Sequence, residues 1–195
     1  GIELGSNYLK DNLKGLDTYK ELEVINLATN NTKKLDSLPL LEKLTHLNLQ
    51  NNRIKDYALL AERTPNLTHL NISQTEAQLE EESFPKLEKL ESINLSETKL
   101  ESWNFLAKQP QLTEIKYTSS APYQIRIPNI KTLEKVDLSI SNVLSDSGSF
   151  LDSLSVCENI KELNLLSIIL LILYSNEIES HLNKIDGFIF RVDLI

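Results

Sequence analysis

The sequence has few of the residues on which several large classes of protein depend. Its single cysteine, Cys157, permits no internal disulfide framework. Five glycines in 195 residues leave no Gly-rich phosphate-binding loop. The most apolar run, residues 165–174, has about half of the roughly 20 residues that a membrane helix needs. We therefore expect a soluble intracellular protein, cytoplasmic or nuclear, that makes no contact with membranes.

Basic residues are also fewer than acidic ones. The 20 Lys and Arg residues stand against 28 Asp and Glu, which gives a formal net charge of -8. A negative surface repels phosphate backbones, so we expect no nucleic-acid partner and instead a protein partner, with a basic surface as the favoured kind. No nucleophile elbow or metalloprotease motif occurs, so we expect no enzyme activity, no catalytic residue and no cofactor.

Methionine is absent, even at position 1, and we expect the chain to be part of a longer protein. With 41% hydrophobic residues the chain can bury a substantial core. No linker long enough to divide domains is visible, so residues 1–195 are predicted to form a single repeat domain.

A repeat of the form L-x-x-L-x-L-x-x-N-x-L organises the chain. Its most regular copy consists of Leu44, Leu47, Leu49, Asn52 and Ile54. The first apolar positions of the successive copies are Leu22, Leu44, Leu67, Leu90, Leu112, Leu133, Ile160 and Ile185. The steps between them are 22, 23, 23, 22, 21, 27 and 25 residues, and residues 2–9 fit the tail of an earlier copy. The chain therefore contains about eight to nine repeats.

These copies resemble the leucine-rich repeat superfamily, in its class of 22–23 residues per repeat. The resemblance implies an α/β solenoid with a parallel β-sheet on the concave face and short helices, turns and extended segments on the convex face. The period-two L-x-L core independently indicates a short strand with one buried face. Strands are predicted to begin near Leu4, Ile25, Leu47, Leu70, Ile93, Ile115, Val136 and Leu163.

The recurring polar position of the frame must have its hydrogen bonds satisfied. In the superfamily this residue lies in the turn after the strand and bonds backbone groups of adjacent repeats. Asparagine occupies the position at residues 7, 30 and 52, threonine at 75 and 98, and serine at 120 and 141. On the convex side, helical turns are predicted after Ile54 and Leu100, an extended connection over 121–128, and a short helix within 145–154.

The residues between the leucines should form columns on the concave face, and these columns are the predicted partner-binding site. A rigid floor of small and polar side chains suits a peptide or a helix of a partner. The candidate residues are Asn26, His46, Asn48, Gln50, His69, Asn71, Ser73, Asn94, Lys116 and Asp137. The alternative is structural, because Leu-Asn-Leu is a common way to form this strand.

Other candidate sites in the sequence are interpreted as structural features and not as functional sites. His46 and His69 should lie about 5 Å apart on adjacent strands, but Ser92 follows them in the column, so no metal site is expected. Asn-x-Ser/Thr sequons begin at residues 30, 66, 71 and 94, and we interpret them as by-products of the repeat. Cys157 is interpreted as a small core residue and the acidic run 80–82 as a solvated convex edge.

Residues 60–71, with Leu47-Asn48-Leu49 and Asn52-Arg53 before them, resemble the acidic leucine-rich nuclear phosphoproteins, which keep a similar L-A-E-x-x-P-N-L-T-H-L-N run. This resemblance implies a nuclear regulator that binds histones. The Asn-Leu-Ser-x-Thr run in place of the asparagine turn, as at 94–98, is similar to runs in substrate receptors of cullin ubiquitin ligases, which would add an adaptor-binding box amino-terminal to the repeats. A bacterial adhesin would need a helical cap and a secretion or wall signal.

Overall fold

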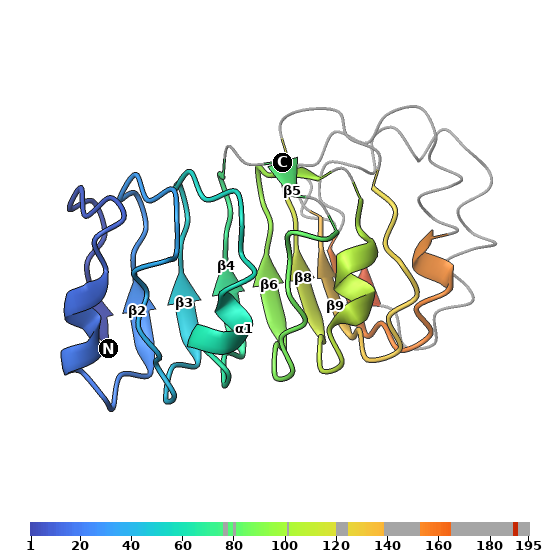
Figure 1. Ribbon diagram of the computed structural model, residues 1–195. Helices are drawn as coiled ribbons and strands as arrows, with labels where there is room; N and C mark the ends of the chain where they lie inside the picture. The colour runs from blue at the N-terminus through green and yellow to red at the C-terminus, as the bar shows by residue number, and fades with distance from the viewer. Residues whose placement is uncertain are drawn as a thin grey trace.

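The computed structural model describes residues 1–75, 78–79, 81–100, 102–119, 125–138, 153–164 and 189–190. A nine-stranded sheet runs through them in the order β1-β2-β3-β4-β6-β8-β9-β10-β11, and every neighbouring pair is parallel (Figure 1). The strands are β1 (Ile2–Glu3), β2 (Val24–Asn26), β3 (His46–Asn48), β4 (His69–Asn71), β6 (Ser92–Asn94), β8 (Glu114–Lys116), β9 (Lys135–Asp137), β10 (Glu162–Asn164) and β11 (Ile189–Phe190). The predicted solenoid of parallel strands is confirmed.

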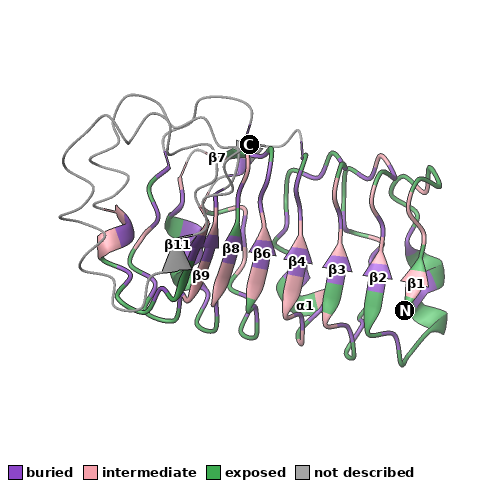
Figure 2. Ribbon diagram, turned by 180° about the vertical axis from the view of Figure 1, so that it is seen from behind, coloured by how far each residue is buried: buried purple, intermediate pink, exposed green. Residues whose placement is uncertain are grey.

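The register of the sheet follows the repeat frame. Ile25 lies opposite Leu47, which lies opposite Leu70, and the pattern continues along the sheet. The middle residue of each three-residue strand is buried and its two neighbours are more exposed, as Figure 2 shows from the sheet side. A single strand residue therefore faces the core, and stacking of repeats buries it.

The strands begin near the predicted positions, one residue earlier in β2, β3, β4, β6, β8, β9 and β10 and two residues earlier in β1. Each strand begins at the exposed residue before the buried one, because the parallel ladder includes that residue. The backbone N–H of His46, for example, donates to the carbonyl of Glu23 at 3.0 Å. The pattern of apolar side chains does not show which backbone groups form hydrogen bonds. The strand therefore begins before its first apolar residue.

The register of the last unit also differs from the prediction. Phe190 pairs with Leu163, whereas the frame that starts at Ile185 places Phe188 there. A shift of two residues keeps the same side chains on the buried face, so the alternation of apolar residues does not distinguish the two registers.

Short helices lie on the convex side of the sheet. They are the 3-10 helices η1 (Lys14–Thr18) and η2 (Asn104–Lys108), the α-helix α1 (Leu60–Arg63) and a helical turn over residues 153–155. The predicted turns after Ile54 and Leu100 are thus confirmed. Strands β5 (Gln78–Leu79) and β7 (Lys99–Leu100) form a small parallel sheet of their own. Residues 125–128 are neither helix nor strand, as predicted for the proline-containing connection, while 121–124 and 145–152 lie outside the described residues.

The polar position of the frame forms a ladder inside the core. Asn52, 2% exposed, accepts the backbone N–H groups of Asn30 and Thr32 at its side-chain oxygen and donates to the carbonyls of Leu27 and Leu49. Asn30, fully buried, repeats this arrangement with the preceding repeat. The role that the superfamily resemblance implies is confirmed for both asparagines. Serines 120 and 141 lie outside the described residues.

Candidate functional site on the concave face

The predicted columns exist as aligned rows across the sheet. Asn26, Asn48, Asn71 and Asn94 occupy one row on four adjacent strands, and Lys116 follows Asn94 in it. His46 and His69 stand side by side in the row before it, with Val24 on one side and Ser92 on the other. Register alone brings these side chains together, because parallel neighbours lie about 4.8 Å apart.

The asparagines of the row share one side-chain conformation. The side-chain oxygen of Asn48 accepts the backbone N–H of Gln50 at 3.0 Å, and Asn71 and Asn94 make the same bond to the residue two positions on, also at 3.0 Å. The asparagines thus have a structural role, which was the alternative to partner binding that the sequence left open. It leaves the NH2 groups of Asn48, Asn71 and Asn94 without a hydrogen-bond partner among the described residues. The face therefore presents three donors in register.

The two histidines form a stacked pair. Their ring centroids are 4.1 Å apart and their planes differ by 8°, which is closer than the predicted separation of the strands. The hydroxyl oxygens of Thr45 and Thr68 lie 2.9 and 2.8 Å from Nδ1 of the following histidine. Each hydroxyl also donates to a backbone carbonyl, so its oxygen accepts from the ring, which places the hydrogen on Nδ1. In the neutral rings Nε2 is then the acceptor.

Burial and a neighbouring ring lower the pKa of His46, one member of this pair. Partial desolvation lowers the pKa of His46 from its ordinary 6.5, the neighbouring His69 lowers it further, and the carboxylate of Glu91 opposes them. Among the described residues, no group of three or more His, Cys, Asp or Glu is placed to hold a metal ion. The pair thus offers a flat stacked surface to a partner.

A groove of about 340 Å³ follows the rows over strands β1 to β6. Six of the predicted site residues line it, namely Asn26, His46, Asn48, His69, Asn71 and Asn94. Four others lie outside it. Gln50 donates to the side chain of Gln74, and Ser73 is only 3% exposed and offers little surface. Lys116 and Asp137 belong to the far half of the face.

That far half, over β8 to β10, carries charges that pair with one another. Lys116 lies 3.8 Å from a carboxylate oxygen of Asp137, and Lys135 lies 3.5 Å from Glu114 and 3.6 Å from Glu162. The carboxylate of Glu114 raises the pKa of Lys135, and Glu162 adds to the effect. The concave face is therefore divided into a half made largely of amides and imidazoles and a half of alternating, paired charges.

Two residues of the predicted columns that are not among the candidate residues, Val24 and Glu3, also line the groove. Val24 is 39% exposed, and the carboxylate of Glu3 accepts from the side chain of Asn26 at 2.8 Å. The threonines behind the histidines, in contrast, were not predicted. A signal was present, because Thr-His-Leu-Asn occurs twice, at 45–48 and 68–71, one repeat apart.

The other candidate residues have structural surroundings. The side chain of Asn30 is buried and bonded on all sides, so this sequon offers no accessible amide. Cys157 is a buried core residue, as predicted, and desolvation raises the pKa of its thiol. In the acidic run, Glu81 lies 3.1 Å from Lys108 on the convex side. No helix among the described residues has the length and apolar character needed to cross a bilayer.

Comparison with known proteins relates this architecture to solved structures. No family model matches the chain. A chain of the Drosophila melanogaster SNF/U2A' complex is 30% identical over 58% of this chain and 70% of its own length, with a TM-score of 0.49. An internalin from Listeria monocytogenes is 15% identical over 79% of this chain, with a TM-score of 0.54, and the leucine-rich repeat domain of APL1 is 18% identical over 80%, with a TM-score of 0.49.

The repeat frame and its one parallel strand per repeat define the class of the protein, and the internalin shares this fold. The chain belongs to the leucine-rich repeat superfamily. It spans 50% of the internalin chain and 52% of the APL1 chain, about half of each. The local resemblance of residues 47–71 to the acidic leucine-rich nuclear phosphoproteins stays a prediction.

Proposed function

We propose that the chain is a protein-binding module that holds a segment of a partner protein, helical or extended, in the concave groove. The contacting residues are His46, Asn48, His69, Asn71 and Asn94. The observation that carries the proposal is the row of three side-chain NH2 groups on adjacent strands that have no partner among the described residues. Donors about 4.8 Å apart suit acceptor groups that recur along a polypeptide, on its backbone or on one face of a helix.

The rigidity of the site supports the proposal. Each amide oxygen is bonded to the backbone, so the side chain is already oriented before a partner arrives. The stacked rings of His46 and His69 restrict one another in the same way. Little side-chain entropy then remains to be lost, which leaves more of the contact energy for affinity.

The net charge of the chain acts on a partner at longer range than these contacts. The chain carries a net charge of -8, which would attract a basic partner during diffusion and raise the association rate. The groove itself is lined largely by neutral side chains, so the hydrogen bonds in it govern dissociation. A basic partner with acceptor groups in its docking segment is therefore part of the proposal, and its association should slow as salt screens charges beyond about 8 to 10 Å.

The test uses binders selected against the unmodified protein from a random peptide display library. Binding is then measured to the triple variant Asn48→Arg, Asn71→Arg, Asn94→Arg, which fills the groove. A matched control adds the same three charges elsewhere, as Asn104→Arg, Gln111→Arg and Asn129→Arg at exposed positions outside the groove.

The expected result is loss of binding in the groove variant and retention in the control, with thermal melts showing that both are folded. If a folded groove variant still held the selected peptides as tightly as the unmodified protein, the interface would lie elsewhere and the proposal would fail.

A further inference from the structure

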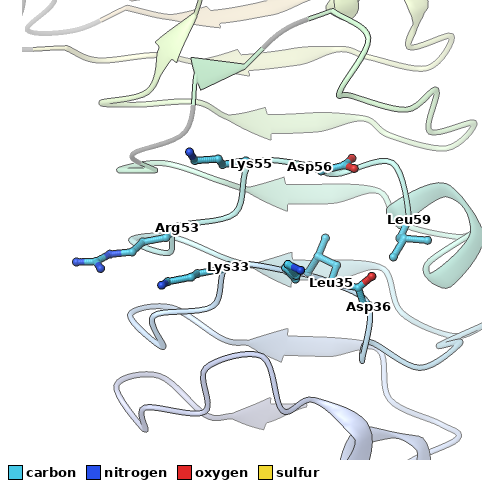
Figure 3. Close-up of a pocket in the computed structure, with 8 residues that line it drawn as sticks. Lys33, Leu35, Asp36, Arg53, Lys55, Asp56 and Leu59 are labelled. Carbon is cyan, nitrogen blue, oxygen red and sulfur yellow. The ribbon is translucent and has the colours of Figure 1, made fainter.

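A second hollow, of about 740 Å³, lies between the return segments that follow strands β2 and β3. Residues 33–36 form one wall, and Arg53, Lys55, Asp56 and Leu59 form the other (Figure 3). We call it the basic groove. It is separate from the concave groove, with which it shares no lining residue.

The charge of the basic groove is opposite to that of the chain. Its lining contains four cationic side chains, Lys33, Lys34, Arg53 and Lys55, against two carboxylates, although the chain carries a net charge of -8. All four are exposed. The ammonium groups of the three lysines form no ion pair or hydrogen bond with any described residue, so they are available to a ligand.

Three of these cations are directed to the same end of the groove. Figure 3 shows the side chains of Lys33, Arg53 and Lys55 pointing toward the same side of the groove, each from a return segment. The segments are tied together below them, because the backbone N–H of Arg53 donates to the carbonyl of Thr32 at 2.7 Å. The buried Asn52 binds the N–H of Thr32 and so anchors both walls. Backbone hydrogen bonds thus join the segments that carry these positive charges.

The other end of the groove has a different chemistry. Figure 3 places Asp36, Asp56 and Leu59 there, away from the cationic ends. Leu59 is half-buried, and Asp56 uses one carboxylate oxygen to accept the backbone N–H of Ala58 at 2.8 Å. A ligand that fills the groove therefore meets positive charge at one end, and negative charge beside an apolar side chain at the other. A uniformly anionic nucleic acid would be repelled at the acidic end and by the chain as a whole.

We propose that the basic groove binds a peptide segment of a partner protein whose carboxylates lie against Lys33, Arg53 and Lys55 and whose apolar side chain covers Leu59. A basic residue of the same segment then faces Asp36 and Asp56. This surface is independent of the concave groove, so the chain can hold two partner segments at once. The concave groove binds hydrogen-bond acceptors of a partner. The basic groove instead recognises where the acidic and basic residues lie along a peptide.

The test is fluorescence anisotropy with a labelled decapeptide that contains four glutamates, two leucines and four lysines, in that order or reversed. A scrambled peptide of the same composition is the reference. The tighter of the two ordered peptides should bind about tenfold more tightly than the scrambled one, because only an ordered sequence matches both charged ends. Equal binding of all three peptides, or no binding to the unmodified protein, would overturn the proposal.

The site is located with the double variant Lys33→Glu and Lys55→Glu. It should weaken binding of the ordered peptide by about tenfold or more, because like charges face each other. The control is Lys20→Glu with Lys43→Glu, which reverses two exposed lysines outside the groove and should leave binding within about twofold. A neutral pair, Lys33→Gln and Lys55→Gln, should lose an intermediate amount, and melts confirm folding.

Two results would count against the assignment of the site. In one, the groove variant and the control weaken binding equally, which indicates attraction by overall charge alone. In the other, an oligothymidylate displaces the ordered peptide at equal concentration, which indicates a site for phosphate backbones rather than for an acidic peptide.

Discussion

The side-chain oxygen of Asn52 accepts the backbone N–H of Asn30 at 3.2 Å, so one buried amide joins two successive repeats. The same oxygen binds the N–H of Thr32 at 2.9 Å, and the NH2 group donates to the carbonyls of Leu27 and Leu49. Both grooves depend on this residue, because it anchors the strands on one side and the return segments on the other.

Replacement of this amide should therefore be costly. Asn52→Ala leaves several buried backbone groups without partners, each worth about 1 to 3 kcal/mol, so the free energy of unfolding should fall by about 3 kcal/mol or more. Urea denaturation measures it. Asn104→Ala, at an exposed position of η2, should change stability by less than about 0.5 kcal/mol. A loss as small in Asn52→Ala as in the control would contradict the ladder.

The leucine rows give a second test of the packing. Leu95 is fully buried, and Leu95→Ala should cost about 2 to 5 kcal/mol because the close-packed row cannot fill the cavity. Leu40 is 46% exposed, so Leu40→Ala should cost about 1 kcal/mol or less. Thermal melts of both variants compare the two positions directly, and equal shifts would be inconsistent with the observed core.

The register of the sheet was predictable because a period of 22 to 23 residues returns each apolar side chain to the same place. That is why the pairs Leu47–Leu70 and His46–His69 follow from the sequence. The register of β11 did not follow, because a shift of two residues preserves the alternation. The first residue of each strand could not be predicted either, because backbone hydrogen bonds define it.

The candidate site was predictable in position and only partly in chemistry. Register places Asn48 and Asn71 side by side, but the bond of each amide oxygen to the backbone, which frees the donors, depends on turn geometry. The basic groove was not predicted, because its walls lie in return segments where no pattern of apolar residues repeats. A signal existed, since Lys33 and Lys55 each stand three residues after an asparagine of the ladder.

A third prediction concerns the turn after β2. Thr29 has a φ of 56°, in the left-handed region, where a β-branched side chain is strained. Asparagine tolerates this region, so Thr29→Asn should raise the free energy of unfolding by about 1 kcal/mol. The same change at the exposed Thr18, whose φ is not positive, should bring no gain. Urea titration of the two variants decides the point, and a destabilised Thr29→Asn would contradict it.

A fourth prediction follows from the stacked rings. The pKa of His46 is lowered from 6.5 in the folded chain, so the unfolded chain binds more protons as the pH falls through that value. Stability that is present at neutral pH should therefore decline below about pH 6.5, and His46→Gln should reduce this decline. Urea titrations at pH 7.5 and 5.5, a range of about two units around the histidine value, measure both effects.

The neighbouring ring supplies an independent check. In His69→Gln the pKa of His46 should move up toward 6.5, because a like charge is removed while the carboxylate of Glu91 remains. The titration of the His46 ring followed by NMR measures this shift. A pKa of His46 unchanged by the loss of its neighbour would show that the rings do not interact in solution.

The proposal that the free NH2 groups of Asn48, Asn71 and Asn94 hold the partner is tested most directly by changing all three to aspartate. Aspartate keeps the oxygen that bonds the backbone N–H, so the turns should stay intact and the melting temperature close to that of the unmodified protein. The donors are lost, and each of the three side chains gains a negative charge.

Surface plasmon resonance with the selected binders then separates the two rates. We expect association to be unchanged or slightly faster, because the added negative charge attracts a basic partner. We expect dissociation to be about tenfold or more faster, because each partner acceptor now meets a carboxylate. A folded aspartate variant whose dissociation rate equals that of the unmodified protein would contradict it.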